Sequence, residues 1–242
     1  MIKKIALTSL LASALTLTAQ ADTTKDDALV THTELGYIGT TGNTKTTTFN
    51  IDTNVKKGFD KHIFKLLLDG QYGSDNDIAS KNKYYLELTY DYKFTDRLAF
   101  SYIVGYKRDK FSAFHSQFFT GPGIKDKIII SDTHNLTLEG SILYSSDDYY
   151  DPAIGTDNYS AYRAKGTYDW QMLKNLKFEQ ELSYRGSFDN VDKYFVYSKS
   201  AFASKISDMF SAGISYKVDY VNQAGTQKHT DTTLTANLIM DY

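Results

Sequence analysis

The feature that most constrains this chain is an alternation of apolar and polar residues that recurs from about residue 30 to the last residue. In residues 230–242, Leu234, Ala236, Leu238 and Met240 occupy every second position, with mostly polar residues between them. A period of two gives a β-strand one apolar and one polar face, whereas a helix repeats every three to four residues. The pattern therefore predicts an all-β fold.

Twelve segments share this alternation, although the sixth is interrupted by Gly121-Pro122-Gly123 and the facing of the tenth is ambiguous. They cover approximately residues 30–40, 46–56, 64–72, 84–92, 98–106, 116–126, 136–144, 162–170, 176–184, 194–205, 210–220 and 230–242. Only two prolines occur in the chain, and its 20 tyrosines and 14 phenylalanines suit strands.

Three properties of the segments favour a barrel that spans a membrane. A segment has about ten residues, the length of a tilted strand that crosses a bilayer. One face carries Leu, Phe, Tyr and Val, and the other carries Lys, Asp, Glu and Arg, so the charged face is expected inside and the apolar face against lipid. For example, Leu86, Leu88, Phe100 and Leu182 are expected to face lipid. The linkers after the third, seventh and eleventh segments are expected to be long external loops, and most others short turns.

The fold expected is a single antiparallel transmembrane β-barrel of about twelve strands, with ten or fourteen as alternatives. Backbone groups in lipid need hydrogen-bond partners, so the sheet must close. An even strand count returns both ends of the chain to the periplasm.

The first 21 residues have the three parts of a secretory signal peptide. A short basic start, with Lys3 and Lys4, precedes an apolar stretch and the small-residue cleavage site at Ala19-Gln20-Ala21. We expect a signal peptide over residues 1–21, a short periplasmic lead over 22–29, and an outer-membrane barrel over 30–242. The chain has no cysteine, which excludes a lipoprotein anchor and disulfides.

The predicted partners are the lipid of the outer membrane and the barrel-insertion machinery. Alternating apolar residues followed by a final aromatic, here Tyr242, are the segment by which such barrels are recognised for insertion. The 27 basic and 29 acidic residues give no sign of a nucleic-acid partner. The pattern identifies no solute and no cofactor.

Several short motifs resemble one family. The chain contains Glu34-Leu35-Gly36-Tyr37, then the turn Thr41, Gly42, Asn43 and Thr44, and later residues 92–98, residues 106–111 and the Gly121-x-Gly123 pair. With the terminal strand, these motifs resemble the YdiY-like family of salt-induced outer-membrane proteins. The resemblance covers most of the mature chain and implies an outer-membrane barrel. It implies no catalytic residues and no settled activity.

The charged face supplies the candidate functional residues, which are expected to line the lumen. They are Lys65, Asp69, Glu87, Asp91, Lys107, Asp109, Arg163, Lys165, Asp169, Glu179, Glu181, Arg185, Lys217 and Asp219. These charges either pair across strands and plug the lumen or line a narrow pore. A turn near Leu173 is expected to bring Arg163 opposite residues 181–183, and Lys165 opposite Glu181 or Glu179.

A barrel enzyme of the lipase or protease type is the alternative function. A lipase needs a serine–histidine pair, and among the five histidines only His115 adjoins a serine in the sequence. A protease would use acidic residues such as Asp147 and Asp148 in an external loop. The acids of residues 147–157 are also possible calcium ligands, but their spacing matches no known loop motif. We therefore expect a non-enzymatic barrel, either structural or a narrow charge-lined pore, without a metal.

Overall fold

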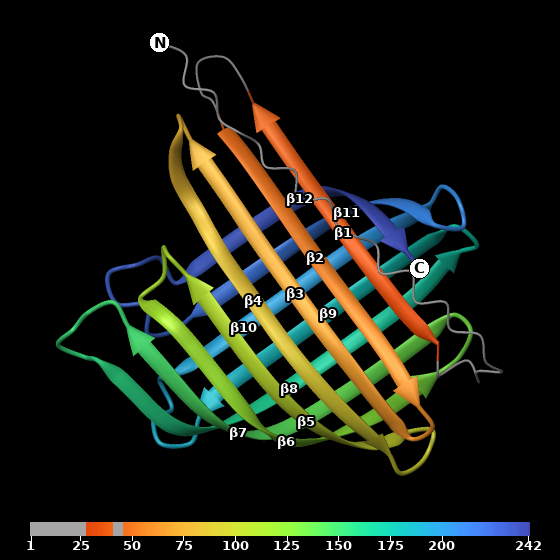
Figure 1. Cartoon of the computed structure of the whole chain (residues 1–242), viewed down its shortest axis with the longest axis horizontal. Helices are drawn as coiled ribbons and strands as arrows, with labels where there is room; N and C mark the ends of the chain where they lie inside the picture. Colours follow the sequence, from red (N-terminus) through yellow and green to blue (C-terminus); the bar gives the residue numbers. More distant parts are fainter. Residues whose placement is uncertain (1–27, 41–45) are drawn as a thin grey trace.

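The computed structural model describes residues 28–40 and 46–242, in which the strands form one closed antiparallel barrel (Figure 1). The strands are β1 (Leu29–Thr40), β2 (Thr46–Phe59), β3 (His62–Asp75), β4 (Ile78–Lys93), β5 (Leu98–Asp109), β6 (Phe114–Ile130), β7 (His134–Tyr149), β8 (Thr156–Leu173), β9 (Leu176–Ser187), β10 (Tyr194–Lys205), β11 (Phe210–Val221) and β12 (Thr230–Asp241). Each strand pairs with the next, and β12 pairs with β1 to close the sheet. The predicted fold class and strand number are confirmed.

The predicted signal peptide and the turn Thr41–Thr44 lie outside the described residues, as does most of the predicted lead. Within residues 28–40 and 46–242, no helix is long and apolar enough to cross a membrane.

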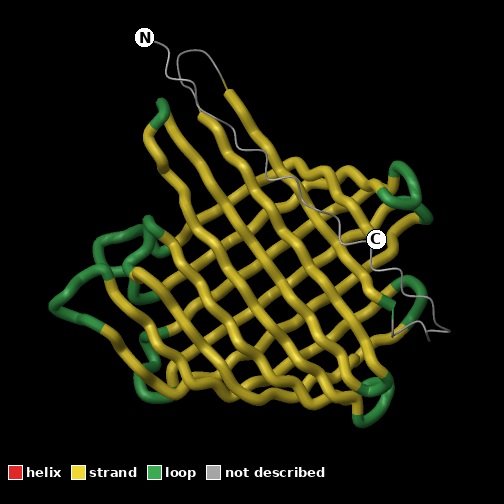
Figure 2. The backbone as a smooth tube through the Cα atoms, viewed as in Figure 1, coloured by secondary structure: helices red, strands yellow, loops and turns green. Residues whose placement is uncertain are grey.

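The connections lie at the two ends of the barrel, and those at one end are shorter (Figure 2). Turns after the even-numbered strands have two to four residues, whereas residues 150–155, 188–193 and 222–229 form longer loops at the other end. The expected long loop after the third strand is wrong. There, β3 and β4 continue to a two-residue turn at Asn76 and Asp77, both with positive φ as tight hairpins require.

Several strands are longer than the segments in which apolar and polar residues alternate, and this has a physical reason. Hydrogen bonds between strands continue wherever the backbone stays extended, but alternation is needed only where one face meets lipid. For this reason β7 and β8 also run on into the expected loop of residues 145–160, leaving only residues 150–155 as a loop.

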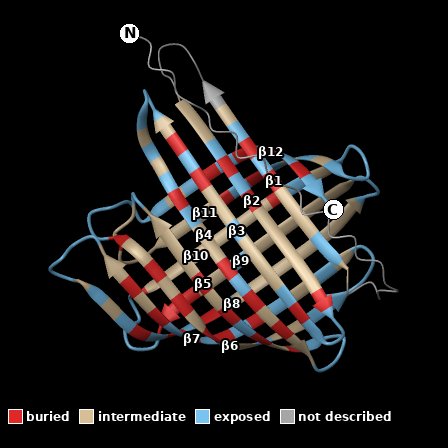
Figure 3. Ribbon diagram, in the orientation of Figure 1, coloured by how far each residue is buried: buried red, intermediate tan, exposed pale blue. Residues whose placement is uncertain are grey.

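Burial alternates along the strands as the two-residue period requires (Figure 3). On β4, for example, Glu87 is buried and its neighbour Leu88 is 48% exposed. Leu182 on β9 is likewise exposed, while Arg185 is buried. The inside of this barrel is therefore charged and its outside apolar.

Aromatic rings form bands on the outer surface near both ends. Toward the loop end, Tyr162, Tyr184, Tyr194 and Tyr220 stack in sequence with ring centroids 5.5–5.8 Å apart. Toward the turn end, Trp170 stacks on His134 at 5.6 Å, and Phe178 packs against Phe202. Aromatic girdles of this kind flank the apolar band of a membrane barrel.

The interruption expected at Gly121-Pro122-Gly123 does not occur, because β6 continues through it. Glycine is required at position 121, where a Cβ would overlap the carbonyl oxygen of Ile142. Gly105 on β5 leaves room in the same way for the Phe119 ring, which lies over it inside the barrel. Gly105 thus lets an aromatic ring lie flat against the inner wall and fill part of the lumen.

Candidate functional site

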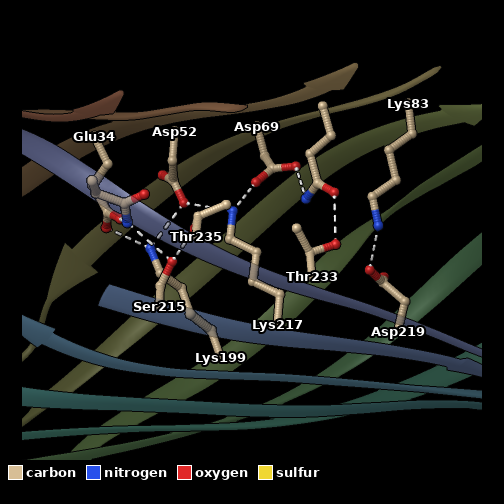
Figure 4. A network of polar contacts seen from close by, with 12 residues as sticks. Glu34, Asp52, Asp69, Lys83, Lys199, Ser215, Lys217, Asp219, Thr233 and Thr235 are labelled. Atoms are coloured by element: carbon tan, nitrogen blue, oxygen red, sulfur yellow. Dashed lines mark hydrogen bonds and ion pairs between the residues drawn. The ribbon is translucent and has the colours of Figure 1, made fainter. Parts of the chain in front are cut away.

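The charged face of the strands produces ion pairs that cross the lumen between strands distant in the sheet. Lys199 on β10 contacts Glu34 on β1 at 2.6 Å and Asp52 on β2 at 2.9 Å. Lys217 on β11 contacts Asp52 at 3.2 Å and also pairs with Asp69 on β3. Figure 4 shows these five residues, which we call the bridge cluster, reaching toward one another from opposite walls.

Neutral polar side chains surround the bridge cluster and complete its hydrogen bonds. Asn237 donates to Glu34 at 2.6 Å and to Ser215 at 3.0 Å. Ser215 and Thr235 share a hydrogen bond of 2.8 Å, and all three side chains are buried (Figure 4). The bridge cluster is therefore a packed polar network, in which each carboxylate has a cationic partner.

A second connection crosses the full width of the barrel. Asp219 on β11 accepts hydrogen bonds from Lys83 on β4 at 2.6 Å and from Lys107 on β5 at 2.9 Å. In the circuit of twelve strands, β11 and β5 lie opposite each other. Lys83 also lies 3.3 Å from Asp231 on β12. We call Asp219, Lys83 and Lys107 the cross-lumen bridge.

A third group of charges joins β3, β4, β6, β7 and β8. The guanidinium of Arg163 contacts Glu87 at 2.6 Å and Glu139 at 2.8 Å. Lys125 on β6 connects Glu139 to Asp91, which also pairs with Lys65 at 3.0 Å. Within the described residues, the buried Nε of Arg163 has no hydrogen-bond partner.

The expected register of the eighth and ninth strands is wrong by two residues. Arg163 lies opposite Arg185, and Glu181 lies opposite Thr167, because the turn occupies residues 174–175 and a register shift follows at Gln171. Arg163 and Arg185 carry like charges, but their guanidinium groups contact different partners. Lys165 nevertheless reaches Glu181 diagonally, at 2.9 Å.

Aromatic side chains close part of the lumen near the loop end. The guanidinium carbon of Arg185 lies 4.9 Å from the Phe119 ring centroid and 4.4 Å from that of Phe195. Asp147, fully buried on β7, contacts Lys193 at 2.9 Å. The Lys193 ammonium also lies 3.9 Å from the Tyr159 ring centroid. These residues, Phe119, Phe195, Arg185, Asp147, Lys193 and Tyr159, form what we call the mouth cluster.

Lys193 belongs to the loop of residues 188–193 rather than to a strand. Burial disfavours its ammonium form, but the nearby Asp147 and Asp157 carboxylates outweigh this effect and raise its pKa. The ammonium therefore attaches the loop to the inside of the barrel through two carboxylates.

The remaining predicted residues occupy the ends of the lumen. Near the turn end, Lys177 pairs with Asp169 at 3.0 Å and with Glu179. Asp109, at the loop end of β5, accepts a hydrogen bond from the backbone of Phe111 at 3.0 Å, which is a local turn contact.

Sequence reasoning missed several residues of these networks. Glu34 and Asp52 stand out of phase with Leu35 and Ile51, so the alternation could have placed both inside. The sequence did not show that Lys199 faces the lumen. Its neighbours on the lipid face of β10 are serines, which made the facing of that strand ambiguous. Lys193 carried no periodic signal, because it lies in a loop.

A cavity of about 590 Å³ remains between these networks inside the barrel. At the turn end its lining includes His32, Asp169 and Lys177, and toward the loop end it includes Lys107 and Phe119. In the described part of the chain, no three histidine or acidic side chains gather as metal ligands would. The arrangement therefore offers an internal space lined by paired charges.

Solved structures include barrels of the same architecture. The chain matches an outer-membrane channel of Pseudomonas putida F1, described as COG4313, with a TM-score of 0.52 and 9% identity over 92% of this chain and 99% of that one. It also matches the NanC porin with a TM-score of 0.48 and 14% identity, covering 88% and 98% of the two chains. With its charged inside and apolar, girdled outside, the protein is an outer-membrane β-barrel.

Relatives by sequence identify the family. The uncharacterized protein YdiY of Escherichia coli (strain K12) is 25% identical over 208 residues, which cover 84% of this chain and 79% of that protein. A family model described as "Protein of unknown function, DUF481" matches residues 33–242. The expected family is thus confirmed: the chain belongs to this YdiY-like family of unknown function.

Proposed function

We propose that the protein is a narrow, non-enzymatic pore of the outer membrane, with a lumen lined by paired charges. The observation that carries this proposal is the cavity of about 590 Å³, to which the side chains of the bridge cluster and the cross-lumen bridge contribute. Barrels of about eight strands are filled by side chains, whereas those of sixteen or more leave an aqueous channel. A barrel of twelve strands lies between these sizes. A lumen of this size that is divided by ion pairs suits the passage of small solutes.

The contacts of the histidines support a non-enzymatic role. His32 lies between Glu34 and Asp241, His62 contacts the Tyr90 hydroxyl, and His115 contacts Arg108 and Asp148. The ring nitrogens of His134 and His229 bond the Tyr168 hydroxyl and the backbone of Val221. Hydrolase chemistry of the serine type would instead need a histidine beside a nucleophilic hydroxyl.

A purely structural barrel is the competing function, and conductance separates the two. The full chain is refolded and inserted into planar lipid bilayers, and single-channel currents are recorded in potassium chloride. We expect small discrete steps. Continued silence, with correct folding shown by heat-modifiable gel mobility, would favour the structural barrel, and hydrolysis of lipid or peptide would favour the enzyme.

The ion pair between Lys165 and Glu181 provides a sharper version of the test. Both residues line the cavity, and Glu181→Gln removes the negative partner while retaining the shape. We expect a larger conductance, a shift of selectivity toward anions, or both, because the Lys165 ammonium is left uncompensated. Asp208→Asn is the matched control, since it changes an exposed acid in the turn of residues 206–209 outside the lumen.

The predicted partners belong to this proposal as well. The short turns are placed at the periplasmic end by the general asymmetry of such barrels. The expectation that insertion machinery recognises the strand ending at Tyr242 stays a prediction.

A further inference from the structure

We propose that the pore favours small zwitterions, solutes that carry one ammonium and one acidic group. This inference rests on the proposed function and names the solute class. It starts from the ion pairs that run from wall to wall across the lumen, which stand beside others that join neighbouring strands. Lys107 and Asp219, for example, come from strands on opposite sides of the barrel.

The ion pairs that cross the lumen in and beside the bridge cluster share one polarity. Around the bridge cluster, one wall supplies carboxylates from β1 to β4, and the facing wall supplies cations from β8 to β11. The carboxylates of these pairs are Glu34, Asp52, Asp69 and Glu87, and the cations are Arg163, Lys199 and Lys217. In the cross-lumen bridge the polarity is reversed, since the carboxylate of Asp219 lies on β11 and its lysines on β4 and β5.

A solute that passes between the walls must separate such pairs. Breaking a buried pair is unfavourable because it leaves a charge without compensation. A simple anion satisfies the lysine but leaves the carboxylate unpaired, and a simple cation does the reverse. A neutral solute of similar size replaces neither charge. A zwitterion places its acidic group on the lysine and its ammonium on the carboxylate, so both remain paired.

The paired groups are accessible from the cavity. Lys107, Asp219, Lys199 and Asp52 all line it, as do Lys165 and Glu181 nearer the wall formed by β8 and β9. A zwitterion in the cavity therefore meets ammonium and carboxylate groups at successive positions. Exchanging partners along these positions lets it advance without an unpaired charge at any step.

The test compares two solutes of the same molecular formula, zwitterionic β-alanine and neutral lactamide. Liposomes containing the full refolded chain are placed in isotonic solutions of each solute, and swelling is followed by light scattering. We expect β-alanine to enter about tenfold faster than lactamide, after the rates of protein-free liposomes are subtracted. Equal rates, or faster entry of lactamide, would overturn the inference while leaving the pore established. Entry of neither solute, together with silent bilayers, would instead overturn the proposed function.

Two variants of the cross-lumen bridge connect the selectivity to its cause. Asp219→Asn frees chiefly Lys107, because Lys83 keeps Asp231 at 3.3 Å. We expect the preference for β-alanine over lactamide to fall severalfold and the reversal potential to shift toward chloride. Adding Lys107→Gln removes the freed cation, so the shift toward chloride should disappear while the preference for β-alanine stays reduced.

Asp208→Asn controls for the loss of one carboxylate, and it should leave both measurements unchanged. Heat-modifiable mobility on gels confirms that each variant forms a barrel. An Asp219→Asn pore that keeps the original solute preference and ion selectivity would contradict the proposal.

Discussion

The bridge cluster and the mouth cluster both bury charges inside the barrel, but Lys217 in the first and Arg185 in the second are stabilised by different means. In the bridge cluster, Lys217 contacts two carboxylates from the opposite wall. In the mouth cluster, Arg185 lies between two aromatic rings, and its nearest carboxylate oxygen in Asp147 is 3.9 Å away. Removing one partner of a buried ion pair destabilises the protein strongly. Contacts between a cation and a ring face are weaker and less directional.

This difference suggests separate roles for the two clusters. The bridge cluster sets which charges a solute encounters in the middle of the barrel. The mouth cluster, through Lys193, fixes a loop to the barrel wall and narrows the lumen with aromatic rings. Replacing residues in each cluster should therefore change stability by different amounts.

The largest effect is expected in the bridge cluster. Lys217→Met removes the cationic partner of Asp69, whose remaining hydrogen bond within the described part of the chain comes from the Gln71 amide at 3.2 Å. The free energy of unfolding should fall by roughly 3–5 kcal/mol, the usual cost of leaving a buried charge unpaired. Reversible urea unfolding in lipid vesicles gives the measurement.

A second substitution shows whether the missing compensation causes that loss. With Asp69→Leu added, no unpaired carboxylate remains, and most of the lost stability should return. If the double variant is no more stable than Lys217→Met, the loss comes from packing and not from the unpaired charge.

The next effect compares a charge placed in lipid with one placed in the lumen. Leu88 is an exposed outward residue, and arginine there should cost roughly 2–4 kcal/mol if it lies near the bilayer midplane. Arginine at the neighbouring Thr89 enters the lumen beside Glu87 and Asp91 and should cost much less. Unfolding from lipid measures both variants, and equal costs would contradict the assignment of the two faces.

A smaller effect is expected in the mouth cluster. Arg185→Met keeps most of the side-chain volume but removes the cation between Phe119 and Phe195, while Asp147 retains Lys193. We expect a loss of about 1–2 kcal/mol, the sum of two moderate cation–π contacts. A double-mutant cycle with Phe195→Leu should show coupling between the two positions. A loss as large as that of Lys217→Met would erase the distinction between the clusters.

The smallest effect concerns pH and is confined to alkaline solution. Because the folded state raises the pKa of Lys193, this lysine adds stability below its unfolded pKa of about 10.5, and the contribution disappears as pH rises through the higher folded value. The stability difference between the parent protein and Lys193→Gln should thus be constant near neutrality and shrink at alkaline pH. A difference that instead shrank below pH 7 would show that another group is responsible.

Much of the fold could be predicted from local patterns. Alternation placed Leu88 outside and Glu87 inside, because neighbouring side chains of a strand point to opposite faces. It failed at strand ends, where β3 and β4 continue to Asn76 and Asp77, because no lipid face is needed there. It also failed on β10, where Ser198 and Ser200 face outward beside Phe202 and blur the apolar face.

The candidate site could be predicted only in part. Lys217 and Asp69 were both expected inside, but nothing in the sequence indicated that they would meet, since 148 residues separate them. The expected pairing of Arg163 with residues 181–183 failed because a turn and a register shift moved β9 by two residues. Partners across a lumen depend on registers added around the sheet, so small local errors accumulate.

The sequence by itself determined the strands, their inward and outward faces and the closed membrane barrel, because these follow from a two-residue period and from the need to satisfy backbone hydrogen bonds in lipid. Only the tertiary structure decided that Asp219 meets Lys83 and Lys107 and that Lys199 meets Glu34 and Asp52. Those contacts depend on how closely opposite walls approach after the barrel closes. That distance is set by the whole circuit of twelve strands and by the side chains that fill it.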